Sequence, residues 1–222
     1  MIVVFDLDDT LYPEKTFFES GLHSVAEFLS NELKLDYSLI EREMLKFYKR
    51  NGREGIFDFI LRKNGFPQKK YVQRCLSVYR KHTPVIKPYK EAIECLDKLI
   101  DYRKYLVTDG NILVQRSKIK ALEINKYFIK TIPTYQYGIL NAKPSTFCFD
   151  LIRKYEALED CSKLVYVGDN PQKDFVNLKS KRYKTIRVLT GAYKDVKLQA
   201  KYEAEYIISS LKELTPKFIK TL

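Results

Sequence analysis

The chain begins with an uninterrupted apolar run that stops at a group of acids. Residues 2–5, Ile-Val-Val-Phe, contain no polar position, and acids follow at positions 6, 8 and 9. A continuous apolar run predicts a strand buried on both faces, as in a parallel sheet with helices on either side. In such sheets ligands bind beyond the carboxyl ends of the strands, so Asp6 and Asp8 mark a candidate site.

Residues 14–86 have a different pattern, with no strand-like run and with apolar residues at helical spacing. In the first stretch, over residues 14–33, Phe18, Leu22 and Val25 lie on one helical face. Ser38 is the expected cap of a second helix. Further helices are expected over residues 38–51, 54–63 and 68–82. This segment is therefore interpreted as a four-helix module inserted after the first strand.

From residue 87 onward, short apolar strands alternate with amphipathic helices. Strands are expected at residues 105–107, within 128–135, and at 164–167, 183–189 and 206–208. Helices are expected over residues 88–100, 112–123 and 210–214, and a further one, with Pro144 near its first turn, is expected to contain Phe147 and Tyr155. Alternation of this kind is typical of an α/β fold with a parallel sheet. The expected organisation is a core domain of residues 1–13 and 87–222 and a helical domain of residues 14–86.

The spacing of Asp6 and Asp8 indicates a specific chemistry. Alternation along a strand puts both carboxylates on one side, where they repel each other unless a cation lies between them. Magnesium binds one or two carboxylates and completes its shell with water and phosphate oxygens. One carboxylate could then attack phosphorus while the other transfers protons. The same acids could equally form a solvated turn or a helix cap, with Asp9 or Thr10 as the N-cap.

Two later loops repeat this arrangement. Thr108, Asp109 and Gly110 follow a predicted strand and precede a helix, and a helix start of this kind binds anions readily. Asp169 and Asp174 follow the strand at 164–167 and could supply a metal ligand and a supporting partner. Taken alone, each loop could also be an ordinary strand-to-helix turn. Chemistry is assigned to these loops only when they are considered together.

Charge and composition narrow the class of protein. The 222 residues carry a formal charge of +12, but the lysines and arginines are spread along the chain without a basic block. A lysine-rich solvated surface explains this charge, and its field would attract phosphorylated metabolites. No signal peptide or membrane span is evident, and the four cysteines are scattered without a CxxC pair. A cytoplasmic protein with reduced thiols is expected.

Together the loops resemble the four motifs of the haloacid dehalogenase superfamily, in the family's order from Asp6 to Asp174. The first motif, DxDxT, is matched by Asp6-Leu-Asp8-Asp9-Thr10, and the second by Thr108 with Asp109 and Gly110. Lys143 before Pro144 matches the third motif, and Gly168-Asp169 with Asp174 matches the fourth, GDxxxxD. The resemblance implies a Rossmann-like core with a helical cap between the first and second motifs, in the phosphatase branch.

The resemblance also implies roles for these residues. Asp6 would be the nucleophile that forms an aspartyl-phosphate, and Asp8 would be the acid and base. Magnesium would be held by Asp6, the backbone carbonyl of Asp8 and Asp169, with support from Asp174. The remaining assignments concern the phosphoryl group. It would be bound by Thr108, the amides of Asp109 and Gly110, and Lys143.

The expected activity is hydrolysis of a small soluble phosphomonoester, such as a sugar phosphate, an acylneuraminate phosphate or a nucleotide. Family members that cleave carbon–halogen bonds lack an acid at the position of Asp8. Sugar phosphomutases share this acid, so a mutase is the alternative, and a polynucleotide phosphatase is a weaker one because no basic stretch interleaved with aromatic residues is present. Arg53, between Gly52 and Gly55, could contact substrate or lie on the surface. A monomer or homodimer is expected, with no membrane partner.

Overall fold

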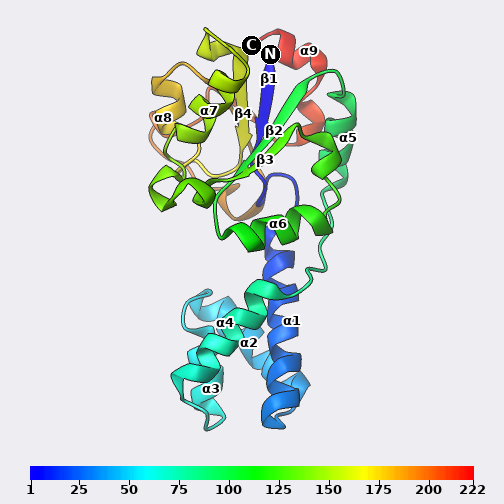
Figure 1. Cartoon of the computed structure of the whole chain (residues 1–222), viewed down its shortest axis with the longest axis vertical. Helices are drawn as coiled ribbons and strands as arrows, with labels where there is room; N and C mark the ends of the chain where they lie inside the picture. Colours follow the sequence, from blue (N-terminus) through cyan, green and yellow to red (C-terminus); the bar gives the residue numbers. More distant parts are fainter. The chain divides into compact units, whose positions relative to one another are not determined.

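A computed structural model describes all 222 residues, which form two compact units. One unit contains Met1–Glu14 and Lys87–Leu222, and the other contains Lys15–Ile86. The first unit holds a parallel sheet, and the second is entirely helical (Figure 1). The helical segment therefore interrupts the chain between the first and second strands of the sheet.

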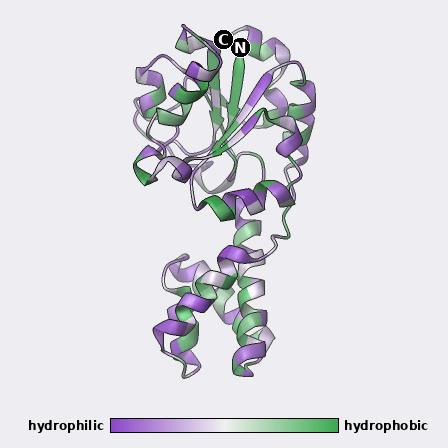
Figure 2. Cartoon of the chain, in the orientation of Figure 1, coloured by the Kyte–Doolittle hydropathy of each residue, from purple (hydrophilic) through white to green (hydrophobic).

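The sheet has six strands in the order β3-β2-β1-β4-β5-β6, and all neighbouring pairs are parallel. The strands are β1 (Ile2–Phe5), β2 (Arg103–Thr108), β3 (Lys130–Pro133), β4 (Leu164–Gly168), β5 (Lys184–Val188) and β6 (Tyr206–Ile208). All four residues of β1 are buried, as its apolar run predicts, and Figure 2 shows this strand as hydrophobic along its length. Phe5 pairs with Leu106 of β2 and with Val167 of β4, so these three strands end at the same edge.

Helices cover both faces of the sheet, which confirms the predicted α/β architecture (Figure 1). The helices of this unit are α5 (Lys90–Lys98), α6 (Ile112–Ala121), α7 (Phe147–Tyr155), α8 (Val176–Ser180) and α9 (Pro216–Lys220). Phe149 of α7 and Leu178 of α8 share a core with Ile2 and Val4 of β1. Against the other face, α5 packs on the C-terminal segment, where the Cys95 thiol lies 3.6 Å from the Leu214 carbonyl oxygen.

The helical unit has its own hydrophobic core. It comprises α1 (Glu14–Leu33), α2 (Tyr37–Asn51), α3 (Ile56–Lys63) and α4 (Lys69–Lys81). Leu22 of α1, Met44 of α2, Ile60 of α3 and Cys75 of α4 are buried together. The predicted cap of α2 was wrong by two residues. Asp36 accepts a hydrogen bond from the Leu39 N–H at 2.7 Å and caps this helix, because its side chain reaches the first free amides. None of the helices combines the length and apolarity needed to cross a membrane.

Short elements account for most differences from the predicted pattern. The helix expected at 210–214 is a single 3₁₀ turn, and α8 and α9 were not predicted, since five residues show little periodicity. The 3₁₀ turns are Asn125–Tyr127, Thr134–Tyr137, Ile139–Asn141, Cys161–Lys163, Gly191–Tyr193 and Leu211–Glu213. They lie in connections, so the sheet and its edge are unaffected.

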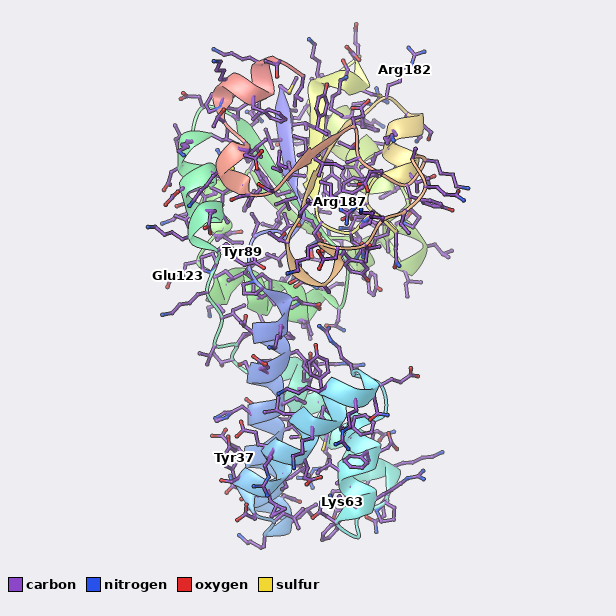
Figure 3. The ribbon with its side chains drawn as sticks, turned by 180° about the vertical axis from the view of Figure 1, so that it is seen from behind. Tyr37, Lys63, Tyr89, Glu123, Arg182 and Arg187 are labelled. Atoms are coloured by element: carbon purple, nitrogen blue, oxygen red, sulfur yellow. The ribbon has the colours of Figure 1, made fainter.

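The sheet also carries a buried cation, Arg187 of β5 (Figure 3). Its guanidinium lies 2.6 Å from a Glu203 carboxylate oxygen and donates to the carbonyls of Tyr193, at 2.6 Å, and Val196, at 2.9 Å. These contacts pair both terminal nitrogens of the buried guanidinium, whereas Nε has no hydrogen-bond partner. Arg187 therefore holds the loop that joins β5 to β6.

Candidate active site

The three central strands deliver polar residues to one edge of the sheet. β1 ends directly before Asp6, β2 ends at Thr108, and β4 ends directly before Asp169. The Asp6 N–H donates to the Val167 carbonyl at 2.9 Å, which holds the end of β1 against β4. This edge is where open parallel sheets bind ligands.

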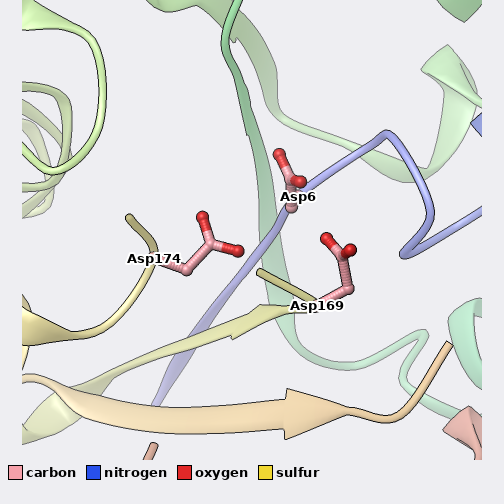
Figure 4. A group of neighbouring side chains, drawn as sticks. All are labelled: Asp6, Asp169 and Asp174. Carbon is pink, nitrogen blue, oxygen red and sulfur yellow. The ribbon is translucent and has the colours of Figure 1, made fainter. Parts of the chain in front are cut away.

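Three of the acids form a compact, buried group. Carboxylate oxygens of Asp6, Asp169 and Asp174 lie within 4.8 Å of one another, and each residue is at most 4% exposed. Figure 4 shows the three side chains as close neighbours. Burial raises the pKa of Asp6 to about 7 against the opposing charge of Lys143, and burial with repulsion from Asp174 and Asp6 raises the pKa of Asp169 to about 9. A cation among these oxygens would remove the repulsion.

Lys143 lies beside this group with its ammonium fully buried. Its Nζ is 2.7 Å from Asp6 Oδ1 and 2.9 Å from Asp174 Oδ1, and it donates to the Tyr166 hydroxyl at 2.7 Å. Burial lowers the pKa of Lys143, but the nearby carboxylates outweigh this effect and hold the pKa well above its usual value. Lys143 is therefore positively charged at neutral pH.

Tyr166 is a member of the site that the sequence analysis missed. Besides meeting Lys143, its hydroxyl lies 3.2 Å from Asp174 Oδ1, and the side chain is completely buried on β4. In the sequence it is one residue of the apolar strand at 164–167, where a tyrosine is ordinary. Nothing in the sequence distinguishes it from the other buried residues of this strand.

The loop after β4 is closely packed around Asp174. Asp174 Oδ2 accepts a hydrogen bond from the Asn170 N–H at 2.9 Å. A Cβ atom at Gly168 would lie only 2.6 Å from the same oxygen. Glycine is therefore required at position 168 by the close approach of the carboxylate.

The loop after β2 combines an unpaired hydroxyl with a helix start. Thr108 Oγ1 is buried and has no hydrogen-bond partner, which is unusual for a buried polar atom. Asn111 caps α6 by accepting from the Leu113 N–H at 3.1 Å and the Val114 N–H at 3.3 Å. The free hydroxyl suits a ligand with acceptor oxygens, such as a phosphoryl group.

The Asp109 carboxylate is held by hydrogen bonds and an ion pair within the protein. Its carboxylate accepts from Thr134 Oγ1 at 2.8 Å and from the Lys143 N–H at 3.1 Å. It also pairs with Lys173 Nζ at 3.1 Å. Lys173, one residue before Asp174, is a second member of the site that the sequence analysis did not identify, because surface lysines are common.

Asp8 lies outside the compact acidic group and has partners of its own. Its carboxylate meets the Tyr12 hydroxyl at 2.5 Å, Lys118 Nζ at 2.7 Å and Gln115 Nε2 at 3.3 Å. Burial raises the pKa of Asp8, but the Lys118 charge and the hydrogen bonds from Lys118 and Tyr12 outweigh this effect, and the net pKa is lowered. Lys118 and Gln115 are further residues that the sequence analysis did not identify.

The charges explain why a divalent cation fits the site. Five carboxylates and three ammonium groups gather here: Asp6, Asp8, Asp109, Asp169, Asp174, Lys118, Lys143 and Lys173. With all of them ionised, the carboxylates outnumber the ammonium groups, and a divalent cation would offset the excess negative charge. Oxygen donors of this type suit magnesium.

Arg53 belongs to the helical unit. Its guanidinium carbon lies 4.9 Å from the centre of the Phe18 ring, and Arg53 lines a cavity of about 450 Å³ together with Phe57 and Tyr79. Stacking of arginine on an aromatic face is favourable, so the ring orients the guanidinium. Its contact with substrate stays a prediction.

Known proteins share this organisation. The glyceraldehyde 3-phosphate phosphatase of Methanocaldococcus jannaschii is 28% identical over 219 residues, which cover 96% of this chain and 94% of the relative. The Pyrococcus furiosus protein of the same name is 24% identical over 222 residues, covering 96% and 90%. These relatives match both the sheet-containing and the helical segments of the chain.

Solved structures agree in fold. A 2-haloacid dehalogenase from Pseudomonas syringae gives a TM-score of 0.67 at 18% identity, covering 100% of this chain and 99% of the other. The HAD-hydrolase YfnB of Bacillus subtilis, solved with magnesium bound, gives 0.65 at 16% identity and covers 96% of each chain. A model of the haloacid dehalogenase-like hydrolases matches residues 1–176, the part that carries all the acids described above. The chain therefore belongs to the haloacid dehalogenase-like hydrolase family.

Proposed function

We propose that this phosphatase hydrolyses a small alkyl phosphomonoester of the glyceraldehyde 3-phosphate class, with magnesium as cofactor and with Asp6 as the nucleophile. The observation that carries the proposal is the buried group of Asp6, Asp169 and Asp174 in contact with Lys143. The substrate class comes from the name shared by the relatives, which align with nearly the whole chain. Asp8 supports phosphate chemistry, because an alkoxide leaving group needs a proton.

Magnesium would be held by Asp6, Asp169 and the backbone carbonyl of Asp8, with Asp174 beside it. When bound, the ion would draw the phosphoryl oxygens into place and neutralise part of their charge. Lys143 supplies a fixed positive charge 2.7 Å from Asp6 Oδ1. Phosphoryl transfer depends mainly on such positioning and charge neutralisation.

The chain's own residues then carry two linked steps. In the first step an Asp6 oxygen forms a bond to phosphorus, the ester P–O bond breaks, and the leaving oxygen takes a proton from Asp8. In the second step a water oxygen attacks the phosphorus of the aspartyl-phosphate and gives a proton to Asp8. The bond between Asp6 and phosphorus breaks, inorganic phosphate leaves and the carboxylate is restored.

The phosphoryl oxygens would be bound by donors at the end of β2 and by Lys143. The unpaired Thr108 hydroxyl is one donor, and the amides of Asp109 and Gly110 at the start of the α6 loop are others. Lys143 interacts with the third oxygen. Backbone donors suit this task, because they are held in place before the substrate arrives.

The test is phosphate release from a panel of esters with magnesium or with chelator. The panel contains glyceraldehyde 3-phosphate, hexose phosphates, an acylneuraminate phosphate, nucleoside monophosphates and a 5′-phosphorylated oligonucleotide. We expect magnesium-dependent turnover concentrated on the small esters and no turnover by Asp6→Asn. Isomerisation of a hexose phosphate without phosphate release would indicate a mutase, and turnover by Asp6→Asn would exclude Asp6 as the nucleophile.

We assign residues 14–86 the role of a cap domain that selects the leaving group, with Arg53 as its candidate contact. If Arg53 binds the substrate outside the phosphoryl group, Arg53→Met should raise KM about tenfold or more and change kcat little. Lys63→Met is the matched control, because Lys63 is an exposed cation of the same unit that pairs with Glu43 at 2.6 Å. Equal KM values for the two variants would show that Arg53 does not bind the substrate.

A further inference from the structure

Helix α6 buries a lysine against Asp8. The Lys118 side chain is 3% exposed, and its Nζ lies 2.7 Å from Asp8 Oδ1. Lysine is rarely buried, because removing its charge from water is costly unless it is paired. Lys120, two residues further along the same helix, is exposed as expected for a surface lysine. The burial of Lys118 therefore calls for a specific role.

A second donor from α6 reaches the same carboxylate. Gln115 lies three residues before Lys118, on the same helical face. Its Nε2 is 3.3 Å from Asp8 Oδ2 and also donates to the Asp109 carbonyl at 2.7 Å. Tyr12 donates to Asp8 Oδ1 at 2.5 Å from the chain that leads into α1. Both oxygens of Asp8 are thus held, and the carboxylate cannot rotate without breaking a hydrogen bond.

We propose that Lys118, supported by Gln115, is a positioning residue that fixes the Asp8 carboxylate for proton transfer to and from the reacting oxygens. The inference rests on the proposed function, in which Asp8 gives a proton to the leaving oxygen as the P–O bond breaks and takes one from water in the second step. Proton transfer requires the donor and acceptor to be held within hydrogen-bond reach. Lys118 meets this requirement without touching the substrate.

The leaving group supplies a sharp test. An alkoxide needs a proton as it departs, whereas 4-nitrophenolate is stable without one. The ratio kcat/KM covers only the steps up to leaving-group departure, so hydrolysis of the aspartyl-phosphate does not affect it. Misplacing Asp8 should therefore lower kcat/KM strongly for an alkyl ester and weakly for 4-nitrophenyl phosphate.

The experiment compares Lys118→Met with Lys120→Met on glyceraldehyde 3-phosphate and on 4-nitrophenyl phosphate. We expect Lys118→Met to lower kcat/KM about 100-fold on the alkyl ester and less than about fivefold on the aryl ester, in line with the usual size of general-acid effects. Lys120→Met should match the wild type on both. Equal losses on the two esters, or no loss, would overturn the inference.

A double variant tests whether Lys118 acts through Asp8. In an Asp8→Asn background, Lys118→Met should cause no further loss on the alkyl ester, because the group that it positions can no longer transfer a proton. Multiplicative losses would overturn the inference. Should Lys118→Met fail to fold, Gln115→Met removes the second donor that α6 supplies to Asp8. It should also lower kcat/KM more for the alkyl ester than for the aryl ester, but by a smaller factor.

The outcomes also separate this inference from the proposed function. If Asp6→Asn keeps its activity, the proposed function fails and the role of Lys118 fails with it. If Asp6→Asn is inactive while Lys118→Met is unchanged on both esters, only the positioning role is lost. Thermal unfolding of each variant, with and without magnesium, confirms that the comparisons are made on folded protein.

Discussion

The Asp109 carboxylate accepts a hydrogen bond from the Lys143 backbone N–H, with 3.1 Å between oxygen and nitrogen. The same carboxylate also binds Thr134 and Lys173. Burial raises the pKa of Asp109, but the charges of Lys143 and Lys173 and these hydrogen bonds outweigh it, so the pKa is lowered and the group is ionised at neutral pH. Asp109 therefore joins the end of β2 to the loops that carry Lys143 and Asp174.

Replacing Asp109 should disturb the site through Lys143. Asp109→Ala leaves the buried Thr134 hydroxyl and the Lys143 N–H without an acceptor, at a cost of about 1–3 kcal/mol in the free energy of unfolding. Because the Lys143 loop loses its anchor, kcat should fall about 10- to 100-fold. Thermal unfolding and steady-state kinetics measure the two effects.

Two milder variants give the control for this experiment. Asp109→Asn keeps one acceptor oxygen but loses the charge opposite Lys173, so it should lie between the wild type and Asp109→Ala. Thr134→Val removes a single donor and should change kcat less than threefold. A wild-type kcat for Asp109→Ala would show that the Lys143 loop holds its position without this contact.

The main acids of the site could be located from the sequence because each follows an apolar run. Asp6 directly follows β1 and Asp169 directly follows β4. Parallel strands bring their carboxyl ends together at one edge of the sheet, whatever the details of packing. The same pattern predicted the order of the strands and of the longer helices along the chain, but not the short α8 and α9. The sequence is most informative where local pattern and topology alone determine position.

The supporting residues could not be predicted in this way. Tyr166, Lys118 and Gln115 are ordinary residues of a strand or a helix, and their contacts depend on which face of the element meets the site. Arg187 is similar, because its burial requires Glu203, which lies 16 residues later in the loop that joins β5 to β6. Such contacts depend on three-dimensional packing. The spacing of apolar residues indicates only whether a position faces the core or the solvent.

The acidic group should make the metal-free protein sensitive to high pH. The pKa of Asp6 is raised to about 7 and that of Asp169 to about 9, whereas both are near 3.8 in the unfolded chain. The native state therefore binds more protons than the unfolded state between about pH 4 and pH 9, and its stability falls as pH rises through this range. Without magnesium, Tm should decrease from pH 6 to pH 9.

Asp169→Asn tests the origin of this effect. Asparagine carries no ionisable proton, so the variant avoids the cost of keeping residue 169 protonated in the native state at pH 8, and the chelator-treated protein should gain about 1 kcal/mol or more, or about 2–4 °C in Tm. Magnesium should raise the Tm of the wild type but not that of the variant, which also loses activity. A Tm below that of the metal-free wild type at pH 8 would contradict the repulsion assigned between Asp169 and the carboxylates of Asp6 and Asp174.

Tyr166→Phe should reduce catalysis more than an equivalent change elsewhere in the same core. The variant removes a hydroxyl that contacts Lys143 and Asp174, so both lose a partner and kcat should fall about tenfold. Tyr183→Phe is the matched control, because the Tyr183 hydroxyl lies 2.6 Å from Asp150, outside the site. Both should lose about 1 kcal/mol of stability. Equal kcat values for the two variants would exclude Tyr166 from the catalytic network.

Gly168→Ala should lower magnesium affinity by displacing Asp174. The added Cβ would lie 2.6 Å from Asp174 Oδ2, and the carboxylate cannot move without disturbing Lys143 and its hydrogen bond from the Asn170 N–H. We expect at least a tenfold weaker magnesium response in activity and a loss of about 1–3 kcal/mol in stability. The matched comparison is Gly168→Ala in an Asp174→Ala background, where only the Tyr166 ring, at 3.2 Å from the added Cβ, stays close and the methyl group should cost less stability. The same stability loss in both backgrounds would mean that the glycine serves the backbone of β4 rather than the placement of Asp174.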